Sequence, residues 1–179
     1  MNGSEFDDAY EDNDENFRKG QDEDYIRSAI LNTPISELEL RKPIFVDAST
    51  PVVDAVHAMR EHHLGCVLVQ QADRLVGIVT ERDVLNRVVF HNENRSLMVE
   101  SVMTHHPETL GSHESTAFAL NMMSVGGYRN IPIVEPKGNV IGVLAVQDIV
   151  AFLVDLFPAG ILNLPTSPEM GIARRTDGG

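Results

Sequence analysis

One short segment carries side chains that suit the binding of a nucleoside phosphate. It reads GIVTERDV, from Gly77 to Val84. The apolar residues before Thr80 predict a strand, and the apolar spacing after Asp83 predicts a helix, whose first N–H groups lie unpaired at its positive end. Thr80 offers a hydroxyl donor for a phosphate or ribose oxygen, and the oxygens of an ionised Asp83 accept both hydroxyls of a ribose diol. Gly77 leaves room for a planar base. The alternative is that Thr80 and Asp83 only cap the helix.

The same corner occurs a second time as GVLAVQDI, from Gly142 to Ile149. The second copy keeps the glycine and the aspartate, Asp148, but has Ala145 where the first has Thr80. The spacing from Gly77 to Gly142 exceeds that from Pro43 to Pro107 by a single position, and the extra residue falls in a turn. An offset that is otherwise constant indicates an internal duplication. The second corner therefore predicts a weaker site, because it lacks the hydroxyl.

The elements around the two corners follow one order in both copies. Each copy has a short extended segment, an amphipathic helix, two apolar runs joined by a tight turn, and a final helix. The extended segments span 43–46 and 107–110, and the paired runs span 66–69 with 75–79 and 131–134 with 140–146. The fold class predicted is α/β (α+β), with two β-α-β-β-α repeats. Neither repeat is large enough to bury its sheet alone, so we expect the two to pack together with pseudo-two-fold symmetry.

Charge and composition divide the chain further. The 179 residues carry a net charge of −13, and ten of the acids lie between Met1 and Asp24. We expect an acidic disordered arm over 1–23, in which residues 3–6 resemble translated cloning sites, and a leading helix over 24–33. The repeats are assigned to 34–92 and 93–157. A tail rich in proline and glycine follows over 158–179 and is expected to be extended.

The same features exclude several functions. An acidic surface repels phosphate backbones, which argues against nucleic-acid binding. No apolar run approaches the roughly 20 residues that cross a membrane, and the acidic start does not resemble a signal peptide. The lone Cys66 lies in an apolar run and is expected to be buried and unreactive, which favours a reducing cytoplasm.

Histidine pairs raise the question of a metal site. His62-His63 and His105-His106 are adjacent pairs, and neighbouring side chains point in different directions. No spacing resembles HExxH, so no metal ligands are predicted. The sequence also shows no nucleophile–base set, no phosphate-binding glycine loop of the nucleotide-hydrolase type and no CxxC pair. No catalytic residue and no catalytic cofactor are predicted, and the chain is not expected to be an enzyme.

These motifs together resemble a known family. The repeat order, the segment VMTHHP at the start of the second copy, IPIV in its middle strand and GIVTERD resemble a tandem pair of CBS domains, named after cystathionine β-synthase. The resemblance covers about Pro34 to Phe157. The ending LFPAGILNLP also resembles small stand-alone bacterial proteins that consist of a CBS pair. The resemblance implies one Bateman-type module that forms a homodimer and binds AMP, ADP, ATP or S-adenosylmethionine.

The resemblance also implies where the ligand lies, between the motif of one repeat and the early strands of the other. The first site comprises Ile78, Thr80, Arg82, Asp83, Met103, Tyr128 and Arg129. The second, weaker site comprises Ile44, Leu64, Gly65, Val143, Gln147 and Asp148. We expect Arg129 to bind phosphate, with a surface or dimer ion pair as the alternative. Arg82 either lies over the base or faces solvent.

The function predicted is regulatory. A ligand that bridges the repeats favours one repeat or dimer geometry, and a protein partner detects the difference. The alternative is a ligand-free structural CBS dimer whose surface or acidic arm recruits a protein.

Overall fold

The computed structural model describes residues 27–89 and 97–156. The predicted acidic arm, the C-terminal tail and the predicted junction between residues 92 and 93 lie outside these ranges. Residues 27–32 are helical and fall within the range expected for the leading helix.

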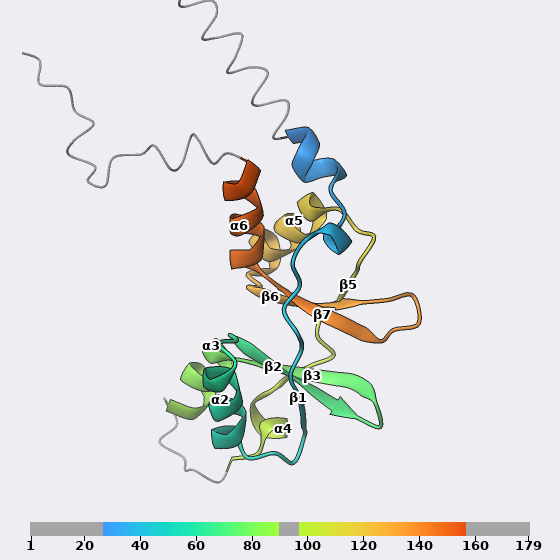
Figure 1. The fold of residues 1–179 in the computed structure, drawn as a ribbon. Helices are drawn as coiled ribbons and strands as arrows, with labels where there is room; N and C mark the ends of the chain where they lie inside the picture. The colour runs from blue at the N-terminus through green and yellow to red at the C-terminus, as the bar shows by residue number, and fades with distance from the viewer. Residues whose placement is uncertain (1–26, 90–96, 157–179) are drawn as a thin grey trace, which may run out of the picture.

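The first unit is a four-stranded sheet with helices on one side (Figure 1, lower half). Its order is β1 (Phe45–Asp47), α2 (Val52–Glu61), β2 (Cys66–Gln71), β3 (Arg74–Thr80), α3 (Glu81–Val84) and the π-helical turn η2 (Leu85–Val89). β1 runs parallel to β2, and β2 runs antiparallel to β3. β4 (Thr104–His105) completes the sheet beside β3. The first four residues of β2 are all buried, because both faces of this strand are covered.

The second unit repeats this plan with a three-stranded sheet. Its order is β5 (Leu110–Gly111), α5 (Thr116–Gly126), β6 (Asn130–Val134), β7 (Val140–Ala145) and α6 (Val146–Leu156). β5 is parallel to β6, and β6 is antiparallel to β7. The predicted β-α-β-β-α order is therefore present twice, and the predicted fold class is confirmed.

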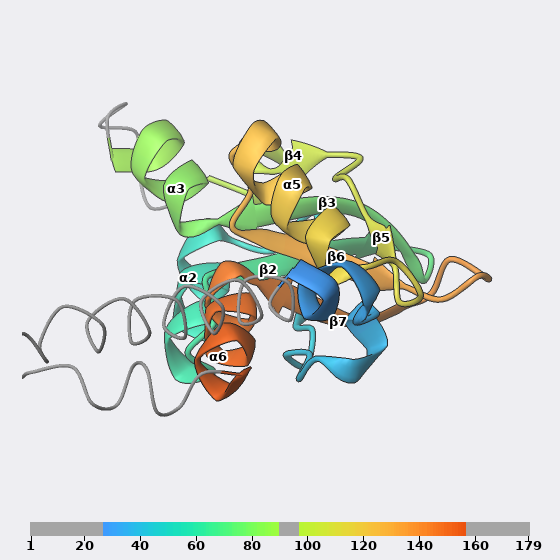
Figure 2. The same ribbon diagram turned by 90° about the horizontal axis from the view of Figure 1, so that it is seen from above.

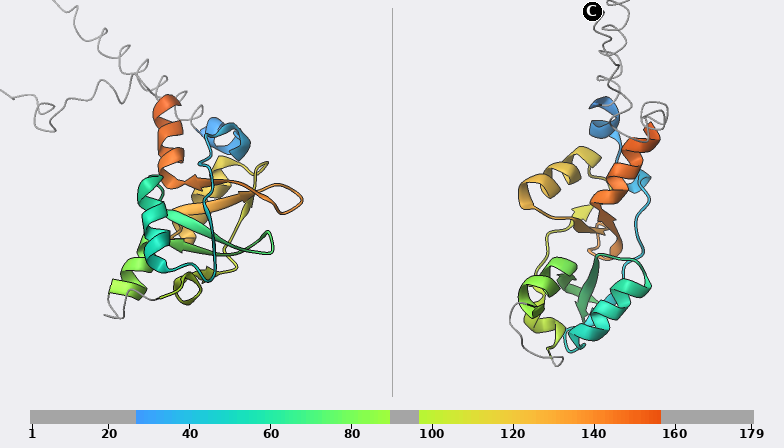
Figure 3. Two further views of the ribbon diagram at one scale, coloured as in Figure 1. Left: turned by 60° about the horizontal axis from the view of Figure 1, so that its bottom comes forward. Right: turned by 90° about the vertical axis from the view of Figure 1, so that its left-hand side faces the viewer.

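The two sheets face each other, and the main helices lie on the outside (Figure 3, right). Cys66, Leu68 and Ile78 of the first sheet pack with Val143 of the second. Figure 2 shows the same stacking from above, with α2 and α6 on one side and α3 and α5 on the other. Each sheet also has a core of its own on its other face, where it packs against the helices of its unit. The two units therefore share one interior, as their small size requires.

Each unit is completed by a segment that the sequence places in the other repeat. Ile35, at the start of the 3-10 turn η1 (Ile35–Glu37), packs in the core of the second unit together with Leu38. The chain then runs down to β1 in the first unit (Figure 1). Conversely, α4 (Val99–Val102) packs its valines in the core of the first unit. Packing therefore crosses the predicted boundary between the repeats. Within the described residues, no helix has the length and apolar character needed to span a membrane.

Candidate functional site

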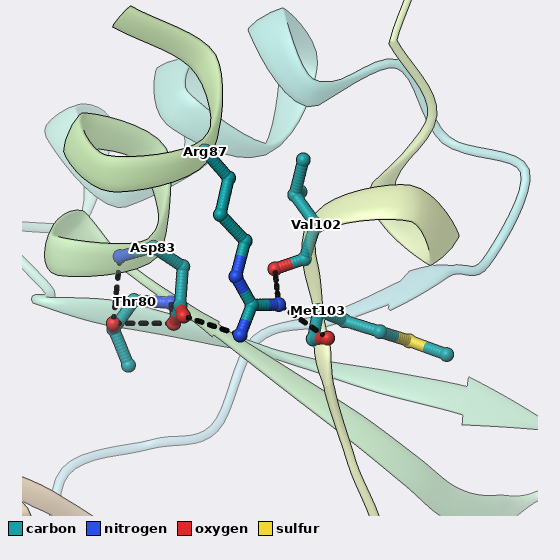
Figure 4. A network of polar contacts seen from close by, with 5 residues as sticks. All are labelled: Thr80, Asp83, Arg87, Val102 and Met103. Carbon is teal, nitrogen blue, oxygen red and sulfur yellow. Dashed lines mark hydrogen bonds and ion pairs between the residues drawn. The ribbon is translucent and has the colours of Figure 1, made fainter. Parts of the chain in front are cut away.

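The corner between β3 and α3 is held by Thr80 and Asp83 (Figure 4). Asp83 Oδ2 accepts hydrogen bonds from the Thr80 backbone N–H at 3.0 Å and from the Thr80 hydroxyl at 2.6 Å. The Asp83 backbone N–H in turn donates to Thr80 Oγ1 at 3.3 Å, which completes a capping box. Thr80 and Asp83 therefore do cap the helix. Because the hydroxyl proton is committed to Asp83, Thr80 positions this carboxylate instead of donating to a ligand.

The second oxygen of Asp83 is less constrained. Arg87 Nη2 lies 3.6 Å from Asp83 Oδ1, which is beyond hydrogen-bond distance. The other terminal nitrogen of Arg87 donates to the carbonyls of Val102 at 2.7 Å and Met103 at 2.8 Å (Figure 4). The guanidinium is therefore held mainly by the end of α4. Asp83 Oδ1 keeps its capacity to accept hydrogen bonds from a ligand.

A cavity of about 340 Å³ opens beside this corner. This volume lies within the range of about 300–1,000 Å³ that is typical of small-molecule sites. Both units line it. The first unit contributes Gly65, Ile78, Thr80, Glu81, Arg82, Asp83 and Thr104, and the second contributes Tyr128, Arg129, Asn130 and Pro132 with the loop glycines before them.

Six of the seven residues predicted for the first site line this cavity, and Met103 does not. Met103 is 5% exposed and packs in the first core, where a Cβ added to Gly77 would lie 2.4 Å from its sulfur. Successive residues of an extended chain point to opposite faces, so Thr104 faces the cavity and Met103 faces the core. Met103 is connected to the corner through its backbone carbonyl, which accepts a hydrogen bond from Arg87.

Arg82 and Tyr128 meet at the loop that follows α5. Gly127 ends this helix in the left-handed conformation, with φ at 69°, a backbone geometry that favours glycine. Arg82 Nη1 donates to the Gly127 carbonyl at 3.3 Å and so connects the first unit to the second. A Cβ on Gly126 would lie 2.1 Å from the ring of Tyr128. Gly126 therefore allows the Tyr128 ring to lie against the backbone at the edge of the cavity.

Several residues that line the first cavity are not among those predicted from the sequence. Thr104, His106, Pro107, Glu108 and Asn130 all line the first cavity. Thr104 belongs to β4, which is too short to have a recognisable periodicity. Asn130 begins β6 opposite Gly65, whose added Cβ would lie 3.4 Å from the Asn130 amide nitrogen. The duplication gives no signal for Asn130, because the offset that relates Pro43 to Pro107 pairs it with the buried Cys66.

The second corner is occupied by an arginine that the sequence analysis did not single out. Asp148 Oδ2 accepts a hydrogen bond from the Ala145 backbone N–H at 2.7 Å. Arg41 Nε lies 2.9 Å from Oδ1 and 3.2 Å from Oδ2 of the same carboxylate. Arg41 Nη2 also donates to Gln147 Oε1 at 3.1 Å. The ion pair is partly buried, with side-chain exposures of 28% for Arg41 and 12% for Asp148.

The six residues predicted for the second site do not share one cavity. Leu64, Gly65 and Gln147 line a cavity of about 620 Å³. Ile44 and Asp148 line two other hollows, and Val143 is buried with 2% exposure. The structure therefore assembles the first predicted site more completely than the second.

The larger cavity adjoins the first and has a positive lining. The two share Gly65, Glu81, Arg129 and Asn130. Its lining includes three arginines, one histidine and one acidic residue. These are Arg41, Arg60, Arg129, His63 and Glu81. Arg129 thus lies at the junction of the two cavities, in a chain whose net charge is −13.

Two other features bear on the chemistry. Within 27–89 and 97–156, no three side chains of the His, Cys, Asp and Glu types gather as metal ligands would. Cys66 is 2% exposed, and burial raises the pKa of its thiol to about 12. Arg41 lowers this pKa and Glu81 raises it, both by less than burial does. The thiol is therefore neutral and shielded near neutral pH.

The fold and the cavity define a class of protein. Two α+β repeats stack sheet to sheet, and a cavity of small-molecule size lies between the motif of one repeat and the strands of the other. The CBS domain family model matches residues 35–89 and 99–155. The chain belongs to the CBS domain family, and the predicted CBS pair is confirmed.

Known relatives and solved structures agree with this assignment. An uncharacterised 17.7 kDa protein of Acidianus ambivalens is 29% identical over 127 residues, which are 70% of this chain and 76% of the relative. Several other relatives are longer, and the matched region is 18% to 24% of their length. The CBS domain protein PAE2072 from Pyrobaculum aerophilum, complexed with AMP, is 22% identical with a TM-score of 0.62, covering 71% of this chain and 100% of that one. The CBS domain pair of protein MJ0100, in complex with 5-methylthioadenosine and S-adenosyl-L-methionine, is 19% identical with a TM-score of 0.62, covering 69% and 97%.

Proposed function

We propose that this chain is a regulatory module that binds an adenosyl ligand, namely AMP, ADP, ATP or S-adenosylmethionine, in the first cavity. The arrangement of Asp83 carries this proposal. Thr80 fixes one carboxylate oxygen. Within the described residues the other oxygen accepts no hydrogen bond, and the Arg87 guanidinium lies 3.6 Å from it. A fixed carboxylate with a free oxygen is a suitable acceptor for the hydroxyls of a ribose.

The other lining residues have complementary roles in this proposal. Ile78 provides a buried apolar surface for the adenine, and Tyr128, a residue that is 41% exposed, provides an aromatic ring. Arg129 binds phosphate, because it lies where the first cavity meets the positive one. Arg82 closes the side of the cavity next to Gly127. Two solved CBS-pair proteins with this fold hold AMP or S-adenosylmethionine, which supports the ligand class.

Regulation follows from the position of the cavity between the repeats. A ligand that contacts both units favours the arrangement in which their lining residues lie closest, and a partner that prefers one arrangement detects it. We propose that the module acts as a cytoplasmic homodimer. The apolar side chains of Phe118, Val125 and Val150 on α5 and α6 are 51%, 81% and 53% exposed, and exposed apolar groups of this kind favour association.

A second candidate is the ligand-free structural CBS dimer. The observation in its favour is the ion pair between Arg41 and Asp148, which engages the carboxylate of the second corner within the chain itself. Binding measurements separate the two functions, because a structural dimer binds no adenosyl ligand.

Calorimetric titration of AMP, ADP, ATP and S-adenosylmethionine tests the proposal. Asp83→Ala removes an acceptor of charge-assisted hydrogen bonds, each worth about 1.5–3 kcal/mol, so two such bonds predict an affinity at least ~100-fold weaker. Asp54→Ala is the matched control, because Asp54 is also an acid in the first turn of a helix, but an exposed one away from the cavity. Circular dichroism verifies that both variants fold. The proposal fails if none of the four compounds binds below about 1 mM, or if Asp83→Ala binds as tightly as the wild type.

A further inference from the structure

The two corners differ at a second pair of equivalent positions besides Thr80 and Ala145. Thr104 pairs with Ile78 in the first sheet, and Arg41 pairs with Val143 in a bridge beside the second. Ile78 and Val143 are counterparts, because each directly follows the glycine of its copy of the duplicated motif. Thr104 and Arg41 are therefore structural counterparts as well. The segment that faces the corner has a short side chain in the first case and an arginine in the second.

Arg41 reduces the capacity of the Asp148 carboxylate to accept hydrogen bonds from a ligand. At the first corner, the strong hydrogen bonds converge on Asp83 Oδ2. At the second corner, Arg41 approaches both oxygens of Asp148, and the Ala145 N–H adds a third contact. The same guanidinium is bonded to Gln147, the counterpart of Arg82. A ribose diol would have to bind the carboxylate oxygens against which the Arg41 guanidinium already lies.

At the second corner, the Arg41 guanidinium replaces the missing hydroxyl as the side-chain donor to the aspartate. Thr80 gives Asp83 a side-chain donor from its own corner. Ala145 has no side-chain donor, and Arg41 provides one to Asp148 from the facing segment. Removal of Arg41 would leave a carboxylate that is only 12% exposed without its countercharge, which is costly. A ligand that competes with Arg41 must meet this cost before it gains any contact.

We infer that Arg41 closes the second corner, so that the chain takes one adenosyl ligand, at Asp83, and none at Asp148. This inference rests on the proposed function. Arg41 is then the residue that determines which of the two duplicated corners is open. The duplicated fold thereby becomes a module with one ligand-binding corner and one that is held internally.

Exchange of the corner residues tests the inference. Arg41→Thr combined with Ala145→Thr gives the second corner the residues of the first. Thr104→Arg gives the first corner the residue that closes the second, and Thr104 is exposed, so the longer side chain has room. AMP, ATP and S-adenosylmethionine are titrated into each protein by calorimetry. We expect one ligand per chain for the wild type, two for the double variant, and an affinity at least tenfold weaker for Thr104→Arg.

A second double variant guards against loss of folding, and three binding results would contradict the inference or the proposed function. Arg41→Met with Ala145→Thr retains the apolar stem of the arginine and replaces the first double variant if that variant melts early. A wild type that binds two ligands per chain overturns the inference. So does a double variant that gains no site while the wild type binds one, and this outcome leaves the proposed function intact. If the wild type binds none of the three compounds, the proposed function fails. A double variant that then binds one per chain still shows that Arg41 closes the second corner.

Discussion

The hydroxyl of Thr80 is predicted to support both the stability of the first corner and its affinity for a ligand. Thr80→Val keeps the shape of the side chain and removes the hydroxyl. The variant loses the 2.6 Å hydrogen bond to the Asp83 carboxylate and the 3.3 Å bond from the Asp83 N–H. Loss of a helix N-cap costs about 0.5–2 kcal/mol, and a hydrogen bond to a charged group contributes about 1.5–3 kcal/mol.

These two contributions overlap, because both pass through the same capping box. Thr80 is also only half-buried, which reduces the cost further. We therefore expect the free energy of unfolding to fall by about 2 kcal/mol, and the Tm to fall by about 4–8 °C for a chain of this length. Affinity for an adenosyl ligand should fall about tenfold, because Asp83 loses the donor that holds its orientation.

Thr80→Ser is the matched control, because it keeps the hydroxyl and loses only a methyl group. Urea and thermal denaturation, followed by circular dichroism, compare both variants with the wild type, and calorimetry gives the affinities. The reasoning is refuted if Thr80→Val unfolds within about 0.5 kcal/mol of the wild type, or if Thr80→Ser loses as much stability as Thr80→Val.

Two further predictions concern the surroundings of the corner. Arg87→Met removes the hydrogen bonds to the carbonyls of Val102 and Met103, and should lower the free energy of unfolding in urea by about 1–2 kcal/mol, since the arginine is partly exposed; an unchanged urea midpoint would show that the end of α4 is held by packing alone. Cys66 has a folded-state pKa of about 12 against an ordinary value of 9.0, so above pH 9.0 the unfolded chain releases a proton that the folded chain retains, and stability falls as pH rises. The stability of the wild type relative to Cys66→Val should therefore decrease by about 1.4 kcal/mol per pH unit between roughly pH 9 and 11, and a difference that stays constant over this range would contradict the burial of the thiol.

The sequence predicts the repeated architecture well because the duplication supplies two independent copies of one pattern. One constant offset aligns Gly77 with Gly142 and Asp83 with Asp148, and both strand pairs lie where the apolar runs place them. The segments that each unit gives to the other are not predicted. Residues 35–41 and 99–105 each form a single helical turn followed by a bridge or a two-residue strand, and elements this short show no hydrophobic period.

The same limit explains the residues that were misplaced or missed. Met103 and Thr104 are neighbours, and only the pairing of β4 with β3 decides which of them faces the cavity. Arg41 lies in the polar run Arg41-Lys42, where no pattern distinguishes it. The spacing from Arg41 to Thr104 is also shorter than that from Pro43 to Pro107, so the offset of the duplication does not align the two residues. Only the bridge to Val143 reveals that they are equivalent.

The most direct test of the proposed site is a crystal structure of the chain grown with AMP. We predict electron density for one AMP per chain, with its ribose hydroxyls within hydrogen-bond distance of Asp83 Oδ1. Arg41 should remain on Asp148. Density for a ribose on Asp148 with Arg41 displaced, or for AMP away from Asp83, would contradict the proposed site.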